Sequence, residues 1–165
     1  MNTQQIHSVS SLTSPLSVVS RAAEAVTTSA NHRQVTVVAN GCFDCLHAGH
    51  IALLRFAKQQ GDHLIVLVNS DESVKRLKGN SRPIMPLEHR IALLEACRYV
   101  DEVIVFEDDT PERAVEVIRP DVLVKGDDYR DHEVAGRAYA GKVAYAPLLQ
   151  NVSTSRIVTA IVLSH

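Results

Sequence analysis

The residues most suited to chemistry are two histidines, His47 and His50, which stand three positions apart. Apolar residues recur at helical spacing from Ile51 onward, so we expect a helix to begin near His47, with both rings on the same side of its first turn. The first amides of a helix lack intrahelical partners, and the aligned peptide dipoles attract anions to that end. Gly49, between the histidines, leaves room for a ligand. The pattern indicates a cradle for a polyphosphate.

Two other interpretations of the histidine pair are a zinc site and two unrelated surface residues. A zinc site needs a third ligand nearby, and Cys42, Asp44 and Cys45 are close in the sequence. Their spacing fits none of the common zinc patterns. We therefore favour phosphate binding and expect no metal ligand from the protein itself.

A second anion site is expected at Ser153, Thr154 and Ser155. These residues precede an apolar helical pattern, where a serine or threonine is commonly an N-cap. A plain N-cap is one interpretation of the segment. The other is that its hydroxyls and amides form a phosphate-sized site facing the histidines, which we favour.

Four of the basic residues between the second and third expected strands bear on the function. Lys78 and Arg82 fall in or beside a loop and supply the positive charge that triphosphate chemistry requires. Arg90 and Arg98 stand eight residues apart on an expected helix over 87–99, so they share one of its faces. Arg90 fits a structural ion pair as well as a substrate contact, and Arg98 is a candidate substrate contact.

A polar segment, Lys125 to Tyr129, directly follows an apolar strand pattern. Lys125 can hold an anionic substrate as a point charge, and Gly126 permits close backbone approach. Asp127 and Asp128 can accept hydrogen bonds from sugar hydroxyls or help to position Mg²⁺. The alternative is an ordinary polar turn.

Short apolar strand patterns alternate with amphipathic helical patterns along the chain. Strands are expected over 35–39, 63–69, 100–106, 121–124 and 143–146, and helices from 47–49, over 70–77, 87–99 and 111–118, and from 153 to about 162. This alternation predicts an α/β fold: a Rossmann-like, doubly wound, parallel five-stranded sheet in a single domain. Ligands of such sheets bind beyond the carboxyl ends of the strands, which is where most of the candidate residues fall.

The chain divides into three parts by composition. Residues 1–12 are rich in Ser, Gln and Thr and are expected to be a disordered tail. Residues 13–34 are expected to form an N-terminal helix and a linker, because Ser14-Pro15 is a good helix start ahead of an apolar pattern that runs to about Thr28. Residues 35–165 form the expected functional domain.

The composition excludes several classes of function. The chain has 165 residues, 45% of them hydrophobic, 22% charged, and a net charge of −2, so nothing indicates a nucleic-acid partner. Its apolar runs are too short for a membrane span, and its N-terminus does not resemble a secretory signal. Three cysteines, an odd number, favour free thiols in a reducing cytoplasm. We expect a cytoplasmic protein with no membrane partner.

The segment from Gly41 to His50, Gly-Cys-Phe-Asp-Cys-Leu-His-Ala-Gly-His, resembles the HxGH signature of the cytidylyltransferase-like nucleotidyltransferases. Within that superfamily the chain is most similar to the adenylyltransferase domain of ADP-heptose synthases. The similarity extends from about residue 35 to 158. The supporting segments are 69–79, 82–90, 109–113, 119–126 and 153–157.

The resemblance implies transfer of AMP from ATP, with Mg²⁺, to a sugar 1-phosphate, D-glycero-manno-heptose 1-phosphate, giving ADP-heptose and pyrophosphate. It implies catalytic roles for His47, His50, Lys78 and Lys125. The implied nucleotide-binding residues are Asn40, Gly41, Cys42, Phe43, Asp44, Gly49, Arg82, Ser153, Thr154 and Ser155. The implied sugar-phosphate residues are Lys125, Gly126, Asp127, Asp128, Tyr129 and Arg98. A homodimer is also implied, as is a separate sugar kinase that supplies the acceptor.

Some segments differ from the heptose enzymes. Asp127 stands where those enzymes have a second glycine, and the segments 126–128 and 98–103 are similar to glycerol-3-phosphate cytidylyltransferases. The Arg-Thr-Glu-Gly that precedes the Ser/Thr motif in that second family is absent, and Leu149 to Val152 stand there instead. The alternative function is therefore a CTP-dependent enzyme acting on glycerol 3-phosphate or a similar alcohol phosphate. A third hypothesis is a nucleotide-binding sensor without turnover.

Overall fold

The computed structural model describes residues 33–164. The tail expected over 1–12 and the helix expected from Ser14 to about Thr28 lie outside these residues. The described chain runs in the order expected from its periodicity, with α3 and α4 both between β2 and β3 and only short 3₁₀ turns between β4 and β5.

Five parallel strands form one sheet, β1 (Thr36–Gly41), β2 (His63–Asn69), β3 (Glu102–Phe106), β4 (Val122–Gly126) and β5 (Lys142–Ala146). Their order across the sheet is β3-β2-β1-β4-β5, so β1 is central and pairs with both β2 and β4. The sheet is therefore built outward from β1 in both directions. This confirms the Rossmann-like, doubly wound α/β fold.

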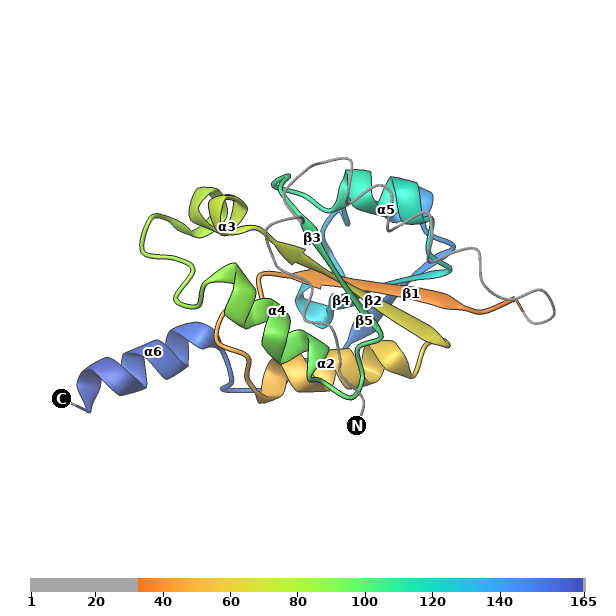
Figure 1. Ribbon diagram of the computed structural model, residues 1–165. Coiled ribbons are helices and arrows are strands. Elements are labelled where there is room, and N and C mark those ends of the chain that lie inside the picture. Colours follow the sequence, from red (N-terminus) through yellow and green to blue (C-terminus); the bar gives the residue numbers. More distant parts are fainter. Residues whose placement is uncertain (1–32, 165) are drawn as a thin grey trace, which may run out of the picture.

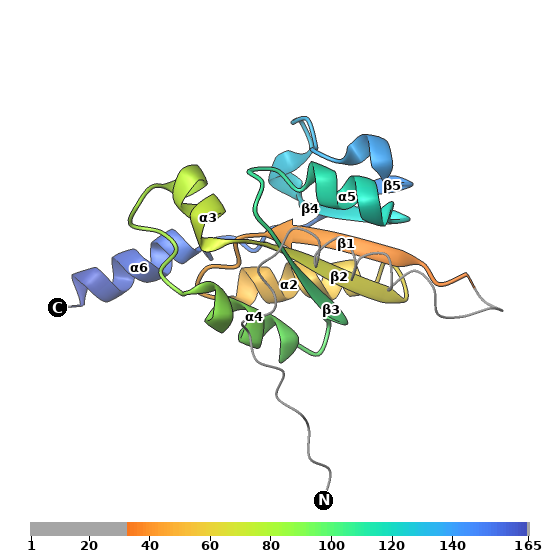
Figure 2. The same cartoon turned by 45° about the horizontal axis from the view of Figure 1, so that its top comes forward.

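Helices cover both faces of the sheet (Figures 1 and 2). They are α2 (Ala48–Lys58), α3 (Asp71–Lys78), α4 (Leu87–Glu95), α5 (Glu112–Ile118) and α6 (Thr154–Leu163), with short 3₁₀ turns at Asp127–Tyr129 and Arg137–Tyr139. The helices α2 and α4 lie on one face and α5 lies on the other. The helix α6 extends away from the sheet in both views and buries none of its residues.

The core is two apolar layers, one on each side of the sheet. Alternate residues of β1 enter opposite layers: Val37 and Ala39 pack toward Leu54 of α2, whereas Val38 packs toward the layer that contains Val115 of α5. Burial of these β-branched strands on both faces is what a parallel sheet requires. It fixes the carboxyl ends of β1, β2 and β4 at one edge.

The helix expected over 87–99 is shorter than predicted, because α4 ends at Glu95. Arg98 therefore lies outside the helix, is exposed, and precedes β3, whereas Arg90 is buried. The prediction that these two arginines share a helix face is wrong. The periodicity continued through Ala96, but a turn at the end of α4 leads the chain toward β3 instead. Within the described residues no helix is long and apolar enough to cross a membrane.

Candidate active site

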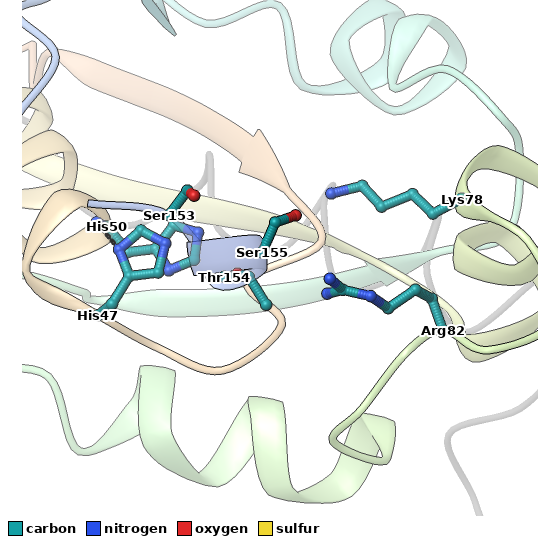
Figure 3. Close-up of a pocket in the computed structure, with 7 residues that line it drawn as sticks. All are labelled: His47, His50, Lys78, Arg82, Ser153, Thr154 and Ser155. Atoms are coloured by element: carbon teal, nitrogen blue, oxygen red, sulfur yellow. Dashed lines mark hydrogen bonds between the residues drawn. The ribbon is translucent and has the colours of Figure 1, made fainter. Parts of the chain in front are cut away.

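A cavity of about 360 Å³ opens at the carboxyl edge of the sheet and is lined by seven residues. These are His47, His50, Lys78, Arg82, Ser153, Thr154 and Ser155. All seven were predicted from the sequence as catalytic or nucleotide-binding residues. Figure 3 shows the histidines at one side, the lysine and arginine reaching in from the other, and the Ser/Thr segment between them.

His47 is the N-cap of α2. Its Nδ1 accepts hydrogen bonds from the backbone N–H groups of Gly49 (3.1 Å) and His50 (3.4 Å). From the sequence these amides were expected to be free for a ligand, but the imidazole occupies them. In the neutral ring Nδ1 then carries no proton and Nε2 must carry it. His47 thereby becomes a neutral hydrogen-bond donor at the pocket wall.

The two imidazoles stack on each other, with ring centroids 3.8 Å apart and planes inclined by 16°. Burial lowers the pKa of His47. For His50, burial and the nearby His47 and Lys78 lower the pKa to about 3, although Asp44 opposes them. His50 Nδ1 is buried without a hydrogen-bond partner among the described residues. Both rings are therefore neutral at physiological pH, and one of them retains an unmet hydrogen-bonding capacity.

The start of α6 forms the middle of the pocket. Ser153 is the N-cap, and its hydroxyl accepts from the backbone N–H of Arg156 at 3.3 Å. The Thr154 hydroxyl donates to the backbone carbonyl of Asp44 at 2.6 Å. The amides of the first two helical residues, Thr154 and Ser155, have no intrahelical acceptor because of their position. The N-cap interpretation is therefore confirmed. Anion binding at this helix end stays a prediction, and it would use the free amides rather than the hydroxyls of Ser153 and Thr154.

Two cations complete the pocket, one from the end of α3 and one from the loop that joins α3 to α4. Lys78 ends α3 and is exposed, and Arg82 is partly buried. The Arg82 guanidinium donates from Nη1 to Asp44 Oδ2 at 2.8 Å. In Figure 3 both side chains point toward the Ser/Thr segment. Neutral donors on one side and positive charge on the other suit a polyphosphate.

A second polar group lies at the ends of β1 and β4, outside the residues that line this cavity. Lys125 donates from Nζ to Asn40 Oδ1 at 2.6 Å, and its ammonium lies 5.1 Å from the centroid of the Tyr129 ring. Burial lowers the pKa of Lys125 to about 8, and Asp128 opposes that change. A Cβ added to Gly126 would meet the side chains of Asp128 and Leu148. The predicted sugar-phosphate residues 125, 126, 128 and 129 are thus brought together.

Three other residues predicted to contact substrate instead contact other parts of the protein. Asp127 is exposed and pairs with Arg130 (2.8 Å from Arg130 Nε to Asp127 Oδ1). Phe43 is buried, and its ring lies 5.2 Å from that of His50, so it supports the histidine. Arg98 is exposed at the opposite edge of the sheet and stacks on Tyr99. The structure does not bring Arg98 to either polar group.

The start of the β1–α2 loop is fixed by Arg90, which is 1% exposed. Its guanidinium donates to the Cys42 carbonyl at 2.6 Å, to Asp71 Oδ1 at 2.7 Å and to the Met85 carbonyl at 3.1 Å. The sequence left its role open between an ion pair and a substrate contact. These three bonds settle it as structural support for the loop, because a buried arginine with all its edges engaged has no room for a substrate.

Within the described residues, no group of three or more His, Cys, Asp or Glu side chains is arranged to hold a metal ion. Cys42, Cys45 and Cys97 are free thiols.

Comparison with known proteins agrees with this geometry. Residues 38–160 match the family model described as cytidylyltransferase-like. The chain belongs to the cytidylyltransferase-like family. Membership confirms the resemblance drawn from the HxGH segment, since the match includes most of β1, the histidine pair and the start of α6.

Curated relatives of this family member include proteins named bifunctional protein HldE. That of Hahella chejuensis is 50% identical over 131 residues, which are 77% of this chain and 28% of the relative. That of Photorhabdus laumondii is 48% identical over 142 residues, which are 84% of this chain and 30% of the relative. The chain therefore spans less than a third of the length of these relatives.

Solved structures show the same fold. A lipopolysaccharide core biosynthesis protein from Thermoplasma volcanium superposes with a TM-score of 0.57 at 28% identity, over 72% of this chain and 99% of that chain. A pantothenate synthetase from Thermus thermophilus superposes with a TM-score of 0.54 at 17% identity, over 87% of this chain and 70% of that chain. At that identity the second likeness concerns the fold alone.

Proposed function

We propose that this protein is a nucleotidyltransferase that transfers AMP from ATP to a sugar 1-phosphate, D-glycero-manno-heptose 1-phosphate, giving ADP-heptose and pyrophosphate. The observation that carries the proposal is the cavity in which the starts of α2 and α6, Lys78 and Arg82 converge. The HldE relatives and the lipopolysaccharide core biosynthesis protein support the choice of acceptor, in line with the likeness to ADP-heptose synthases.

The proposed reaction is an in-line displacement. A phosphate oxygen of the acceptor attacks the α-phosphorus of ATP and forms a P–O bond there. The bond from the α-phosphorus to the bridging oxygen breaks, and pyrophosphate leaves with the electron pair. The attacking oxygen is already anionic, so no general base is needed, and positioning and charge stabilisation supply the catalysis.

The roles of the side chains follow from their positions. The Nε2–H of neutral His47, the ring of His50 beside it and the first amides of α6 would hold the triphosphate. Lys78 and Arg82 would neutralise the charge that builds on the leaving pyrophosphate. Lys125, beside Asn40 and Tyr129, would hold the acceptor phosphate. Mg²⁺ would enter as part of the substrate MgATP, because the side chains lining the cavity are basic or hydroxyl groups and phosphate oxygens are its preferred ligands.

Three further features belong to the same proposal. A sugar kinase must supply the 1-phosphate. Use of ATP and the three free cysteines of the described chain favour a cytoplasmic location. The family resemblance favours a homodimer.

The test is pyrophosphate release with ATP and CTP, each offered with D-glycero-manno-heptose 1-phosphate and with glycerol 3-phosphate. Turnover with ATP and the heptose phosphate is expected. Turnover with CTP and glycerol phosphate would favour the second candidate, which is based on the segments 126–128 and 98–103. Silence in all four mixtures, with ATP still bound, would point to a different acceptor or to a sensor and would overturn the stated activity.

A further inference from the structure

The most completely engaged carboxylate beside the cavity is that of Asp44, whose side chain is 1% exposed. It accepts hydrogen bonds from Arg82 Nη1 at 2.8 Å and from the backbone N–H groups of Ile84 at 3.0 Å and Met85 at 2.9 Å. Burial raises the pKa of Asp44, but the two backbone bonds and the Arg82 guanidinium outweigh it and lower the pKa overall. The carboxylate is therefore charged and has no free face for a ligand.

Asp44 also contacts the start of α6, which lines the cavity. Its backbone carbonyl accepts the hydrogen bond from the Thr154 hydroxyl at 2.6 Å. The loop that carries His47, the loop that carries Arg82 and the start of α6 thus meet at this one residue. These three segments are far apart in the sequence, and they supply five of the seven residues that line the cavity; the other two are His50 of α2 and Lys78 of α3.

The backbone on either side aims this side chain inward. Phe43 has φ +48° and Cys45 has φ +53°, which are left-handed conformations in residues other than glycine. Such conformations persist only where the surrounding structure holds them, and they cluster at functional sites. Here they turn the loop so that the carboxylate faces Arg82 and the 84–85 backbone, while the next residues lead into α2.

We propose that Asp44 is a positioning residue: it holds one edge of the Arg82 guanidinium so that the rest of the group faces a polyphosphate in the cavity. This role rests on the proposed function. Asp44 would act on the nucleotide indirectly, through Arg82, in place of the direct nucleotide contact expected from the sequence. Arginine presents several N–H donors in a rigid fork, so one carboxylate can fix its orientation and leave other donors for a second anion.

The test is a double-mutant cycle on the binding of inorganic tripolyphosphate, measured by calorimetry. Asp44→Asn and Arg82→Ala should each weaken binding, by about tenfold or more, as expected for loss of a charge-assisted contact. The double variant should bind no more weakly than the worse single variant, because both changes remove the same contact. Losses that multiply in the double variant, or an Asp44→Asn protein that binds like the wild type, would overturn the inference.

Rescue of binding by guanidinium ion distinguishes a positioning role of Asp44 from a purely structural one. In Arg82→Ala, millimolar guanidinium should restore part of the tripolyphosphate affinity by occupying the vacated place on Asp44. In Arg82→Ala with Asp44→Asn it should not, because the carboxylate that holds it is gone. Equal rescue in both proteins contradicts the proposal.

The exposed pair of Arg76 and Asp109 serves as a matched control, since its 2.7 Å contact has the same chemistry away from the cavity. Asp109→Asn should leave tripolyphosphate binding unchanged. If Asp44→Asn does not fold, Asp44→Glu keeps the charge and displaces it by one methylene. Its loss of affinity should vanish in the Arg82→Ala background, and persistence of that loss would count against the inference. A wild-type protein that fails to bind tripolyphosphate would overturn the proposed phosphate site itself.

Discussion

His47 accepts the backbone N–H of Gly49 while its ring lies against that of His50, with ring centroids 3.8 Å apart. The same imidazole therefore caps a helix and forms part of the pocket wall. These two roles use different ring nitrogens, so they can be separated by substitution.

Replacing His47 by Asn should separate the cap from the chemistry. Asparagine is a good N-cap and can accept from the same amides, but it has no counterpart of the Nε2–H. We expect His47→Asn to lose on the order of 10²–10³ in rate with little change in stability. His47→Ala should lose the same rate and also about 1 kcal/mol of unfolding free energy. Pyrophosphate release and urea unfolding measure the two effects, and an active His47→Asn enzyme would refute the role of Nε2.

Gly49→Ala should reduce activity without reducing stability. A Cβ at this position would lie 3.0 Å from Cε1 of His47, which is closer than a relaxed contact, so the ring must move. Alanine also favours a helix over glycine by roughly 0.5–1 kcal/mol. We expect an unchanged or higher melting temperature together with a fall in kcat/KM on the order of tenfold. A variant with full activity would show that the ring position is not critical.

His50 should make stability depend on pH in mildly acidic solution. Its pKa is lowered from 6.5 in the unfolded chain to about 3 in the fold, mainly by burial. Above pH 6.5 the ring is neutral in both states and adds no pH dependence. Between pH 6.5 and 3 only the unfolded chain takes up the proton, so stability falls as the pH falls, by at most about 1.4 kcal/mol per pH unit.

The comparison protein for this pH effect is His50→Gln. Urea unfolding of both proteins at pH 7.5, 6.0 and 5.0 should show that the stability advantage of wild type over His50→Gln shrinks with each step. Parallel curves would mean that the ring becomes protonated in the folded protein as readily as in the unfolded chain.

Lys125 should give the pH profile of kcat/KM an alkaline limb, which is a decline at high pH. Burial lowers its pKa to about 8, so its positive charge is present below that pH and is lost as the pH rises through it. We expect kcat/KM for the sugar phosphate to fall above pH 8, mainly through KM, because the charge would hold the acceptor. In Lys125→Arg the limb should move beyond pH 10, since a guanidinium keeps its proton. An identical limb in both proteins would assign it to another group.

His47 and Ser153 could be predicted because their positions depend on short-range sequence patterns. His47 and Ser153 stand directly before apolar helical repeats, and the position at a helix start already determines where their side chains lie. The sheet was predicted for a similar reason, since an apolar run such as that over 64–68 is recognisable without knowledge of its neighbours.

Three features of the structure were not predicted, each for a different physical reason. The role of Asp44 depends on Arg82, Ile84 and Met85, which are about forty positions away. No local sequence pattern indicates those contacts. Arg98 was assigned to a helix face by periodicity, but α4 ends at Glu95. The occupancy of the α2 amides by His47 depends on a side-chain rotamer, which the residue type does not determine.

The helix α6 supplies part of the pocket wall, yet it buries none of its own residues and extends away from the sheet (Figures 1 and 2). Its first turn is joined to the core by the bond from Thr154 to the Asp44 carbonyl. An anion between the start of α2 and the start of α6 would therefore add a bridge between the body of the protein and its last helix. By thermodynamic linkage, a ligand that binds more tightly when α6 is packed against the domain must also stabilise that packing. Occupancy of the cavity and the position of the last helix are therefore energetically coupled.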